Sequence, residues 1–331
     1  MRKLWIAAGA VVLFGFAAGC GASDGQPAAQ TAASSQTAVS TPAVSVPSAP
    51  SATASEQTSR SKPPSPSRLE KVKFHSKALN ADKRLQIYLP PGYDASRRYP
   101  VLYLLHGYFG TESAWMPEMQ TDKAADRLIE DGSIEPLIIV APEMDNSYGL
   151  NSSDAYRLET PKDPVHSRYY GRYEDYMVHD VIGYVDSHYS TEASKKSRYI
   201  GGYSMGGFAS LHIAFRHPDL FSKVGGHSPA LWTDWSSVPR MKSWLYPTAA
   251  ERKRRDPVQL ARTADLSGMS VYLDCGDKDD YKLYVGTSQL YDALQARGIP
   301  SEYHLGSGNH SRTYWKSHIE DYLRFYAGIP S

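Results

Sequence analysis

Two uninterrupted apolar segments restrict the fold of this chain more than any other feature of its sequence. Residues 101–105 read Val-Leu-Tyr-Leu-Leu, and residues 137–140 read Leu-Ile-Ile-Val. A strand with one face in water alternates apolar and polar residues, whereas a strand inside a parallel sheet is covered on both faces and is apolar throughout. The two segments therefore predict a parallel sheet that is buried on both sides.

Other segments extend this pattern into an alternation of strands and helices. We expect strands also at 85–89, 137–141, 199–202, 271–275 and 302–305, and helices at 174–188, 205–217, 284–297 and 313–326. Such alternation predicts an α/β protein with a mostly parallel sheet flanked by helices on both faces. The stretches 146–172 and 231–265 fit the alternation poorly, and we expect these insertions to form the rim of a functional site.

The N-terminus has the pattern of an export signal. A positively charged Arg2-Lys3 pair precedes an apolar stretch at 4–18, which is shorter than the about 20 residues that a membrane-spanning helix needs. The stretch ends in Ala17-Ala18-Gly19-Cys20, which resembles the lipobox of bacterial lipoproteins, although Ala17 replaces the usual leucine. The resemblance implies that 1–19 are a signal peptide, that Cys20 is lipidated and that the protein is anchored at the outer face of the bacterial cell membrane. An ordinary cleaved signal beside an incidental cysteine is the alternative.

A second segment without globular character follows the signal. Residues 21–67 consist mostly of Ala, Ser, Thr, Pro and Gln and contain no Leu, Ile, Met or aromatic residue. Such a sequence cannot bury enough apolar surface to offset the entropy lost on ordering. We therefore expect 20–67 to be a disordered tether behind the lipidated cysteine, and 68–331 to form one folded domain.

The composition argues against several classes of protein. A net charge of +1, from 36 Lys and Arg against 35 Asp and Glu, argues against a nucleic-acid partner. The sequence has no apolar run of about 20 residues, which argues against a polytopic membrane protein. Two cysteines cannot form a disulfide framework, and if Cys20 carries lipid we expect Cys275 to be a small buried residue.

The strongest functional signal is a Gly-x-Ser-x-Gly motif at Gly202-Tyr203-Ser204-Met205-Gly206. The motif follows a predicted strand and opens a predicted helix. In that setting the serine projects from a sharp turn whose crowded backbone leaves room only for glycines. The helix N-terminus directs its N–H groups towards a developing oxyanion. We therefore predict Ser204 as a catalytic nucleophile and the N–H of Met205 as an oxyanion donor.

The sequence around this motif resembles the esterase D-like family of the α/β-hydrolase superfamily. The members of this family include feruloyl and acetyl xylan esterases, S-formylglutathione hydrolases, enterobactin-type esterases and the mycolyltransferase antigens. The resemblance implies an α/β-hydrolase fold and a serine esterase that needs no cofactor and no metal. It covers nearly all of the predicted domain, through segments at 88–93, 103–107, 173–176, 201–207, 217–221 and 314–315.

In this fold the acid and the base follow the nucleophile along the chain. The last predicted strand is followed by Gly306-Ser307-Gly308-Asn309-His310, and we predict His310 as the base because this glycine-containing loop can bring the imidazole over the serine. The preceding strand leads into an acidic run, in which the family's Gly-x-x-Asp pattern implies Asp279 as the acid. Asp277 and Asp280 remain alternatives. A calcium loop is another interpretation of the run, but the run lacks the glycine and the terminal glutamate of an EF-hand.

The second oxyanion donor is expected in the loop after the strand that ends at His106-Gly107. The family resemblance implies the N–H of Tyr108, with Phe109 as the neighbouring alternative. We expect His106 to shape this loop rather than to transfer protons. Trp115 resembles a tryptophan common in this loop of the family, where it either packs or contacts substrate.

These residues predict an exported serine esterase that forms an acyl-enzyme at Ser204. Its substrate would be a small-molecule or polysaccharide-borne ester, with an acyl group on an extracellular saccharide, phenolic or siderophore compound. One alternative is an acyltransferase, in which a sugar hydroxyl replaces water. Another is a binding lipoprotein on an inactive hydrolase scaffold, which would not need Ser204, Asp279 and His310 together. A peptidase is possible on this fold, but the resemblance is to esterases, and the oligomeric state does not follow from the sequence.

Overall fold

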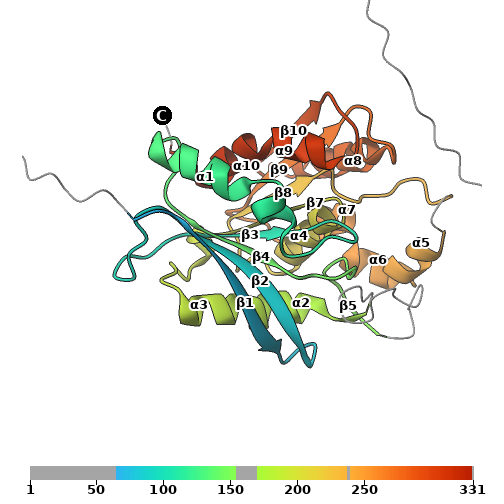
Figure 1. Ribbon diagram of the computed structural model, residues 1–331. Coiled ribbons are helices and arrows are strands. Elements are labelled where there is room, and N and C mark those ends of the chain that lie inside the picture. The colour runs from blue at the N-terminus through green and yellow to red at the C-terminus, as the bar shows by residue number, and fades with distance from the viewer. Residues whose placement is uncertain (1–64, 154–169, 237–238, 330–331) are drawn as a thin grey trace, which may run out of the picture. The chain divides into compact units, whose positions relative to one another are not determined.

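An eight-stranded sheet lies at the centre of the chain as far as the computed structural model describes it, over residues 65–153, 170–236 and 239–329 (Figure 1). Across the sheet the order is β1 (Arg68–Ser76), β2 (Ala81–Leu89), β4 (Ile138–Pro142), β3 (Val101–Leu105), β7 (Arg198–Tyr203), β8 (Lys223–His227), β9 (Ser270–Gly276) and β10 (Ser301–Gly306). Strand β2 is antiparallel to both of its neighbours, and all other neighbouring strands of this sheet are parallel. The prediction of an α/β fold with a mostly parallel sheet is therefore confirmed.

Strand β3 shows why an uninterrupted apolar sequence is needed at the centre of this sheet. Val101, Tyr103 and Leu105 belong to the hydrophobic core on one face. Leu102 and Leu104 belong to the core on the other face. Because both faces are buried, a polar side chain at any of these positions would lose its hydrogen bonds to water. The apolar run therefore predicted its environment correctly.

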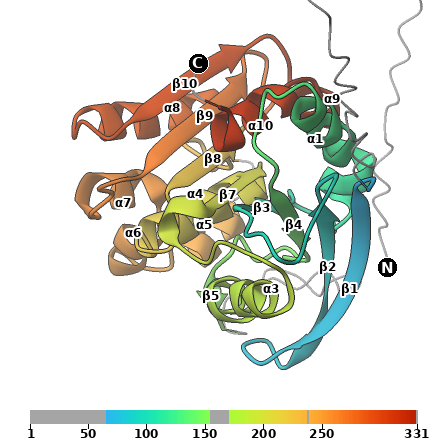
Figure 2. The same cartoon turned by 90° about the vertical axis from the view of Figure 1, so that its left-hand side faces the viewer.

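Helices cover both faces of the sheet (Figure 2). The first core is covered by α2 (Tyr173–Asp175), η3 (Tyr176–Val181), α3 (Ile182–His188), α4 (Met205–Arg216), α5 (Pro239–Leu245), α7 (Pro257–Thr263) and α8 (Leu283–Gln295). The second core is covered by η1 (Ala114–Glu118), α1 (Thr121–Glu130), α9 (Arg312–Ser317) and α10 (Ile319–Ala327). The remaining short elements are β5 (Asn151–Ser152), β6 (Gly171–Arg172), η4 (Lys195–Ser197) and α6 (Ala249–Arg255).

Several of these elements are not predicted by the sequence. Strand β1 lies at the edge of the sheet, and its three apolar residues, Leu69, Val72 and Phe74, are irregularly spaced. Strand β8 has five residues, of which two are glycines, and glycine is a poor strand former. The insertion 231–265 holds the short helices α5, α6 and α7, of which α6 buries none of its residues. Short or exposed elements of this kind carry too little hydrophobic periodicity to be recognised.

Two predicted helices differ in detail from the observed ones. The helix expected at 313–326 is interrupted at His318, which ends α9 and precedes α10. Its ring nitrogen Nδ1 lies 2.8 Å from the carbonyl oxygen of Tyr314, while its backbone N–H donates to Trp315 instead, so the regular helical hydrogen bond is replaced. The helix expected at 174–188 contains the π-helical segment η3 between α2 and α3.

Parts of the predicted organisation lie outside the described residues. These are the export signal at 1–19, Cys20, the tether up to residue 64 and residues 154–169 of the first insertion. None of the described helices is long and apolar enough to cross a membrane.

The close approach of α10 to the sheet depends on glycines in β7 and β8. Tyr326 of α10 is fully buried. A Cβ atom built on Gly201 would lie 1.9 Å from the Tyr326 hydroxyl oxygen, and one built on Gly225 would lie 2.0 Å from it. The tyrosine thus occupies the space that side chains of these two strands would fill. This explains why β8, unlike β3, is not an uninterrupted apolar sequence.

We expect Gly201→Ala to lower the free energy of unfolding by about 1–3 kcal/mol, because the added methyl group overpacks the contact with Tyr326. Tyr326→Phe removes the clashing hydroxyl, so the double variant should recover part of this loss in a double-mutant cycle measured by urea denaturation. Gly183→Ala on α3 is the control, since a Cβ there meets no described atom within 4 Å. Equal losses at the two glycines would contradict this account of the packing.

Candidate active site

Ser204 lies in the tight turn between β7 and α4. Its φ of +54° is in the left-handed region, which residues other than glycine rarely adopt. The backbone holds it there, because its N–H donates to the carbonyl of His227 at 2.9 Å and its carbonyl accepts from Ala230 at 2.9 Å. The turn can close because Gly206 has no side chain, and a Cβ there would lie 2.2 Å from the carbonyl oxygen of Leu105. The serine is therefore fixed at the carboxyl end of the central strands.

His310 lies in the loop that follows β10, as the sequence predicted. Its Nε2 is 2.8 Å from Ser204 Oγ, although 106 residues separate the two in the chain. Tyr281 and Trp315 stand edge-on to the imidazole, with ring centroids 5.1 and 5.0 Å away. These two contacts restrict the orientation of the ring and direct Nε2 at the serine.

Of the three carboxylates that the sequence left open, Asp279 is the one that reaches the imidazole. Its Oδ2 lies 2.7 Å from His310 Nδ1, and its Oδ1 accepts the N–H groups of Tyr281 and Leu283 at 3.0 and 3.3 Å. Burial raises the pKa of Asp279, but the hydrogen bond and charge of His310 and these N–H groups outweigh it, so the pKa lies below its ordinary value. An ionised carboxylate only accepts, so Nδ1 carries the proton and Nε2 is left to accept from Ser204.

The neighbouring acidic residues are placed differently. Asp277 is exposed and accepts the N–H of Gly308 at 3.0 Å, which braces the loop that carries the histidine. Asp280 is exposed at the surface. Cys275 is buried, as predicted, and burial raises the pKa of its thiol. Among the described residues, no cluster of His, Cys, Asp and Glu side chains could hold a metal ion.

The two predicted oxyanion donors border the serine from different elements. Met205 begins α4, and the first N–H groups of a helix have no acceptor within it. In the loop after β3, the N–H of Phe109 donates to Asn146 Oδ1 at 2.9 Å. Tyr108 precedes it and lines the same cavity as Ser204. Tyr108 thus borders Ser204, and the N–H of the neighbouring alternative, Phe109, is held by Asn146.

His106 and Trp115 support this loop from inside. His106 accepts the N–H of Met144 at Nε2, at 2.9 Å, and donates from Nδ1 to the carbonyl of Gly107 at 2.8 Å. Burial lowers the pKa of His106, so the ring stays neutral in this arrangement. Trp115 is buried and donates from Nε1 to the carbonyl of Leu105 at 3.0 Å. Both residues therefore shape the loop, and Trp115 packs rather than lining the cavity over Ser204.

A buried ion pair behind the loop was not predicted. The side chain of Lys83 in β2 is 1% exposed, and its Nζ lies 2.7 Å from Asp145 Oδ2 and 3.9 Å from Glu143. Asp145 also accepts a hydrogen bond from the hydroxyl of Tyr173. Asp145 precedes Asn146, so this pair fixes the segment whose amide holds Phe109. A lysine just before a predicted strand suggests an exposed side chain, so the sequence carries no signal for this pair beyond its charges.

A second buried network lies beneath the nucleophile turn. His227 Nδ1 is 2.8 Å from Asp274 Oδ1, and the Tyr322 hydroxyl donates to Asp274 Oδ2 at 2.9 Å. His227 and Asp274 are fully buried, and the carbonyl of His227 accepts the N–H of Ser204. The network therefore joins β8, β9 and α10 directly under the serine. It was missed because strand β8, which carries His227, was not predicted, and because Asp274 lies inside a predicted strand without any local sign of a partner.

A cavity of about 840 Å³ opens over Ser204 and His310. Most of its side-chain lining is aromatic, from Tyr108, Phe109, Tyr148, Tyr203, Trp232, Tyr281 and Trp315. Arg240 and Arg312 also line it, and no Asp or Glu does among the described residues. The insertion 231–265 supplies part of this wall, so the expectation that it borders the site is confirmed.

A serine, an aspartate and a histidine in this chain order, joined by hydrogen bonds at the carboxyl end of a mostly parallel sheet, define an α/β-hydrolase of the serine hydrolase type. The family comparison agrees. Residues 76–326 match the family model described as "Putative esterase". The chain therefore belongs to this esterase family.

Curated relatives are enzymes of greater length. The endo-1,4-beta-xylanase/feruloyl esterase of Xylanibacter ruminicola is 26% identical over 259 residues, which cover 76% of this chain and 30% of the relative. Endo-1,4-beta-xylanase Y of Acetivibrio thermocellus is 23% identical over 236 residues, which cover 68% of this chain and 19% of the relative. The chain thus matches less than a third of the length of these two proteins.

Solved structures establish the same fold. A ferulic acid esterase superposes with a TM-score of 0.65 at 24% identity, covering 79% of this chain and 98% of that one. FphF, a fluorophosphonate-binding serine hydrolase of Staphylococcus aureus, also gives a TM-score of 0.65, at 22% identity, covering 80% of this chain and 100% of that one.

We expect Lys83→Met to lower the free energy of unfolding by about 3–5 kcal/mol, because it leaves the buried Asp145 without its cation. Lys71→Met, the same substitution at an exposed position of the adjacent strand β1, should change stability by less than about 0.5 kcal/mol. Chemical denaturation of both variants measures the difference. Similar stabilities of the two variants would show that the buried pair does not hold this segment.

Proposed function

We propose that this chain is an exported serine esterase that hydrolyses its substrate through an acyl-enzyme on Ser204. The observation that carries the proposal is the continuous chain of hydrogen bonds from Asp279 through His310 to Ser204, at 2.7 and 2.8 Å, facing the cavity of about 840 Å³. A binding protein without catalytic activity would not need these three side chains to be joined by hydrogen bonds. Membership of the esterase family supports the same reaction class.

In the first half of the proposed reaction, His310 Nε2 accepts the proton of Ser204 Oγ as the serine attacks the ester carbonyl. Asp279 stabilises the imidazolium that forms and keeps the ring oriented. The Nε2 proton then passes to the alkoxide oxygen of the alcohol as the C–O bond breaks. The products of this half are the free alcohol and an acyl group on Ser204.

In the second half, His310 accepts a proton from water, and the hydroxide formed attacks the acyl-enzyme. The tetrahedral oxyanion in both halves would be stabilised by the N–H groups of Met205 and Tyr108. The hydrogen bond from Phe109 to Asn146 supports this assignment, because it orients the peptide chain next to Tyr108. As this intermediate collapses, the bond between the acyl carbon and Ser204 Oγ breaks and His310 Nε2 returns its proton to Oγ, which releases the carboxylic acid and restores Ser204 and the neutral imidazole. No cofactor takes part in these steps.

We propose an acyl ester of an extracellular saccharide, phenolic or siderophore compound as the substrate. Phe109 and Tyr281 are 66% and 53% exposed at the mouth of the cavity, where an apolar side chain gains free energy only when a ligand covers it. Flat aromatic surfaces of this kind suit a phenolic acyl group or a sugar ring. The names of the relatives, which include feruloyl esterases, point in the same direction.

We expect Asp279→Asn to reduce kcat by about 10²–10⁴, because the amide no longer fixes the tautomer of His310 or stabilises its charge. Asp277→Asn and Asp280→Asn are the matched controls, and each should retain kcat within a few fold, since neither carboxylate contacts the imidazole. The measurement is kcat on one activated ester, such as p-nitrophenyl acetate. A large loss at Asp277 or Asp280 with a normal rate at Asp279 would overturn the assignment of the acid.

We further propose that residues 1–19 are removed on export, that Cys20 carries lipid and that 20–67 tether the esterase domain to the outer face of the membrane. The support is the Arg2-Lys3 pair, the short apolar stretch and Ala-Ala-Gly-Cys before the polar segment. An enzyme anchored in this way would meet esters outside the cell. This position disfavours cytosolic thioesters as substrates.

We expect Cys20→Ser to abolish labelling by a radioactive lipid precursor and to release the protein from sedimented membranes, because the thiol is the group that would carry the lipid. Cys275→Ser is the matched control and should leave both unchanged, since that thiol is buried in the fold. Equal membrane retention of the two variants would show that the anchor is not at Cys20.

A further inference from the structure

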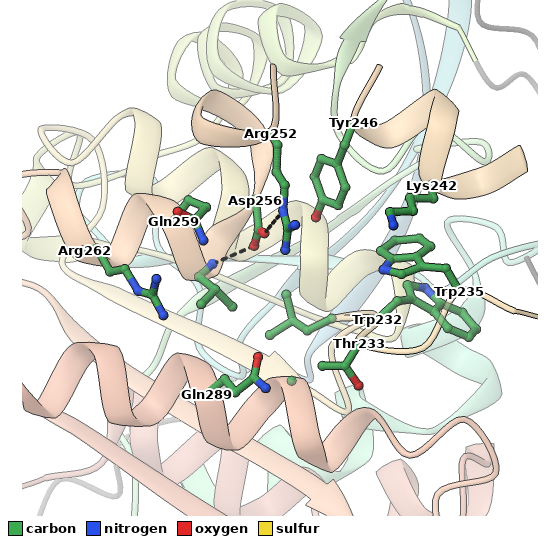
Figure 3. Close-up of a pocket in the computed structure, with 13 residues that line it drawn as sticks. Trp232, Thr233, Trp235, Lys242, Tyr246, Arg252, Asp256, Gln259, Arg262 and Gln289 are labelled. Carbon is green, nitrogen blue, oxygen red and sulfur yellow. Dashed lines mark hydrogen bonds and ion pairs between the residues drawn. The ribbon is translucent and has the colours of Figure 1, made fainter. Parts of the chain in front are cut away.

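A second cavity of about 330 Å³ lies beside the ester cavity, in the region formed by the insertion 231–265 and α8 (Figure 3). This volume is within the roughly 300–1,000 Å³ that small-molecule sites occupy. We call it the tryptophan cavity, after Trp232 and Trp235, which form one of its sides. Trp232 also lines the ester cavity, so the two hollows share a wall. The steps proposed for ester hydrolysis use none of the groups in the tryptophan cavity.

The tryptophan cavity combines flat aromatic surfaces with hydrogen-bonding side chains. The ring centroids of Trp232 and Trp235 are 6.1 Å apart, and Tyr246 stands edge-on to Trp235 at 5.8 Å. Figure 3 shows Gln259 across the cavity from the two tryptophans and Gln289 rising into it from α8. Indole faces that cover the apolar face of a pyranose, with amides that meet its hydroxyls, are the chemistry that recognises a sugar ring.

The charges of this lining select the kind of sugar. Lys242, Arg252 and Arg262 line the cavity, against one carboxylate, that of Asp256. Asp256 is already engaged, because its Oδ2 lies 3.1 Å from Arg252 and its Oδ1 caps α7 through the N–H of Val258. Lys242 and Arg262 make no ion pair with any described residue. The cavity therefore offers two uncompensated cations to a ligand.

The positive lining continues into the ester cavity. Arg240 and Arg312 line that cavity, and none of its described lining residues is acidic. Arg312 is paired with Glu118 at 2.7 Å, while Arg240 is exposed and has no ion-pair partner among the described residues. A ligand that extends from the tryptophan cavity past Trp232 to Ser204 thus meets cations in both.

We propose that the tryptophan cavity is a subsite for an acidic sugar residue, a hexuronate, of the polysaccharide that carries the ester. The proposal rests on the esterase function and names the class of its substrate. The indole faces hold the ring, and Gln259 and Gln289 bind hydroxyls. Lys242, which lies beside the tryptophans, binds the carboxylate, while Arg262 adds positive charge from the opposite side of the cavity (Figure 3). Binding there places an ester on the same chain in the neighbouring cavity and raises its local concentration at Ser204.

The test uses the full-length chain and two unesterified trisaccharides, trigalacturonate and the neutral maltotriose, in calorimetric titrations. We expect trigalacturonate to bind about tenfold or more tightly than maltotriose, with an affinity that falls as salt is added. Trp235→Ala should weaken trigalacturonate binding on the order of tenfold, because it removes a stacking face. Lys242→Gln should weaken it about two- to fivefold, as expected for one exposed ion pair.

The matched control is Lys253→Gln, the same substitution at an exposed lysine of α6 that lines neither cavity, and it should leave binding unchanged. Equal binding of the two trisaccharides, no binding of trigalacturonate, or equal effects of Lys242→Gln and Lys253→Gln would overturn the subsite. Hydrolysis of p-nitrophenyl acetate separates the two proposals. Trp235→Ala and Lys242→Gln should hydrolyse it at the wild-type rate, whereas a wild-type chain that fails to hydrolyse any activated ester would contradict the esterase function itself.

Discussion

The hydrogen bond between His310 Nε2 and Ser204 Oγ, at 2.8 Å, is the contact on which the site depends. The two residues are positioned by different kinds of contact. Ser204 is held by the backbone, in a conformation with φ of +54° that two hydrogen bonds from neighbouring segments maintain. His310 is held by Asp279 and by the rings of Tyr281 and Trp315. A reaction that needs alignment within a few tenths of an ångström therefore relies on groups held at the carboxyl end of the sheet, including a loop that several contacts brace.

Buried charged groups around the site stabilise this alignment, but each of them would destabilise the fold if its partner were removed. Lys83 and Asp145 are removed from water, and each would be an uncompensated charge without the other. Glu174 is also buried, and it accepts a hydrogen bond from the partly exposed Arg216 and lies 2.8 Å from His217. Burial raises the pKa of Glu174, but its histidine and arginine partners lower it further, so it stays ionised. The first pair ties the segment after β4 to strand β2, and the contacts of Glu174 tie α2 to the end of α4.

The sequence predicted the parts of this structure that depend on strong local patterns. The apolar run at 101–105 and the Gly-x-Ser-x-Gly turn each allow few arrangements, and they identified the centre of the sheet and the position of Ser204. Strand β8 was missed because its glycines make room for Tyr326, a residue about 100 positions later in the chain. The Lys83–Asp145 pair and the His227–Asp274 network were missed for the same reason, since each depends on partners that are distant in sequence. The choice among Asp277, Asp279 and Asp280 also needed the fold, because residues one or two apart point in different directions when the chain leaves a strand.

The most direct test of the central claim is the covalent labelling of Ser204 by a fluorophosphonate, followed by mass spectrometry of the intact chain and of its peptides. Activation by His310 makes the Ser204 oxygen more nucleophilic than the other hydroxyls of the protein. The account predicts a single adduct per chain, located on the peptide that contains Ser204, and a labelling rate that falls on the order of 10²-fold or more in His310→Gln. An adduct at another residue, or labelling of Ser204 at an undiminished rate in His310→Gln, would contradict it.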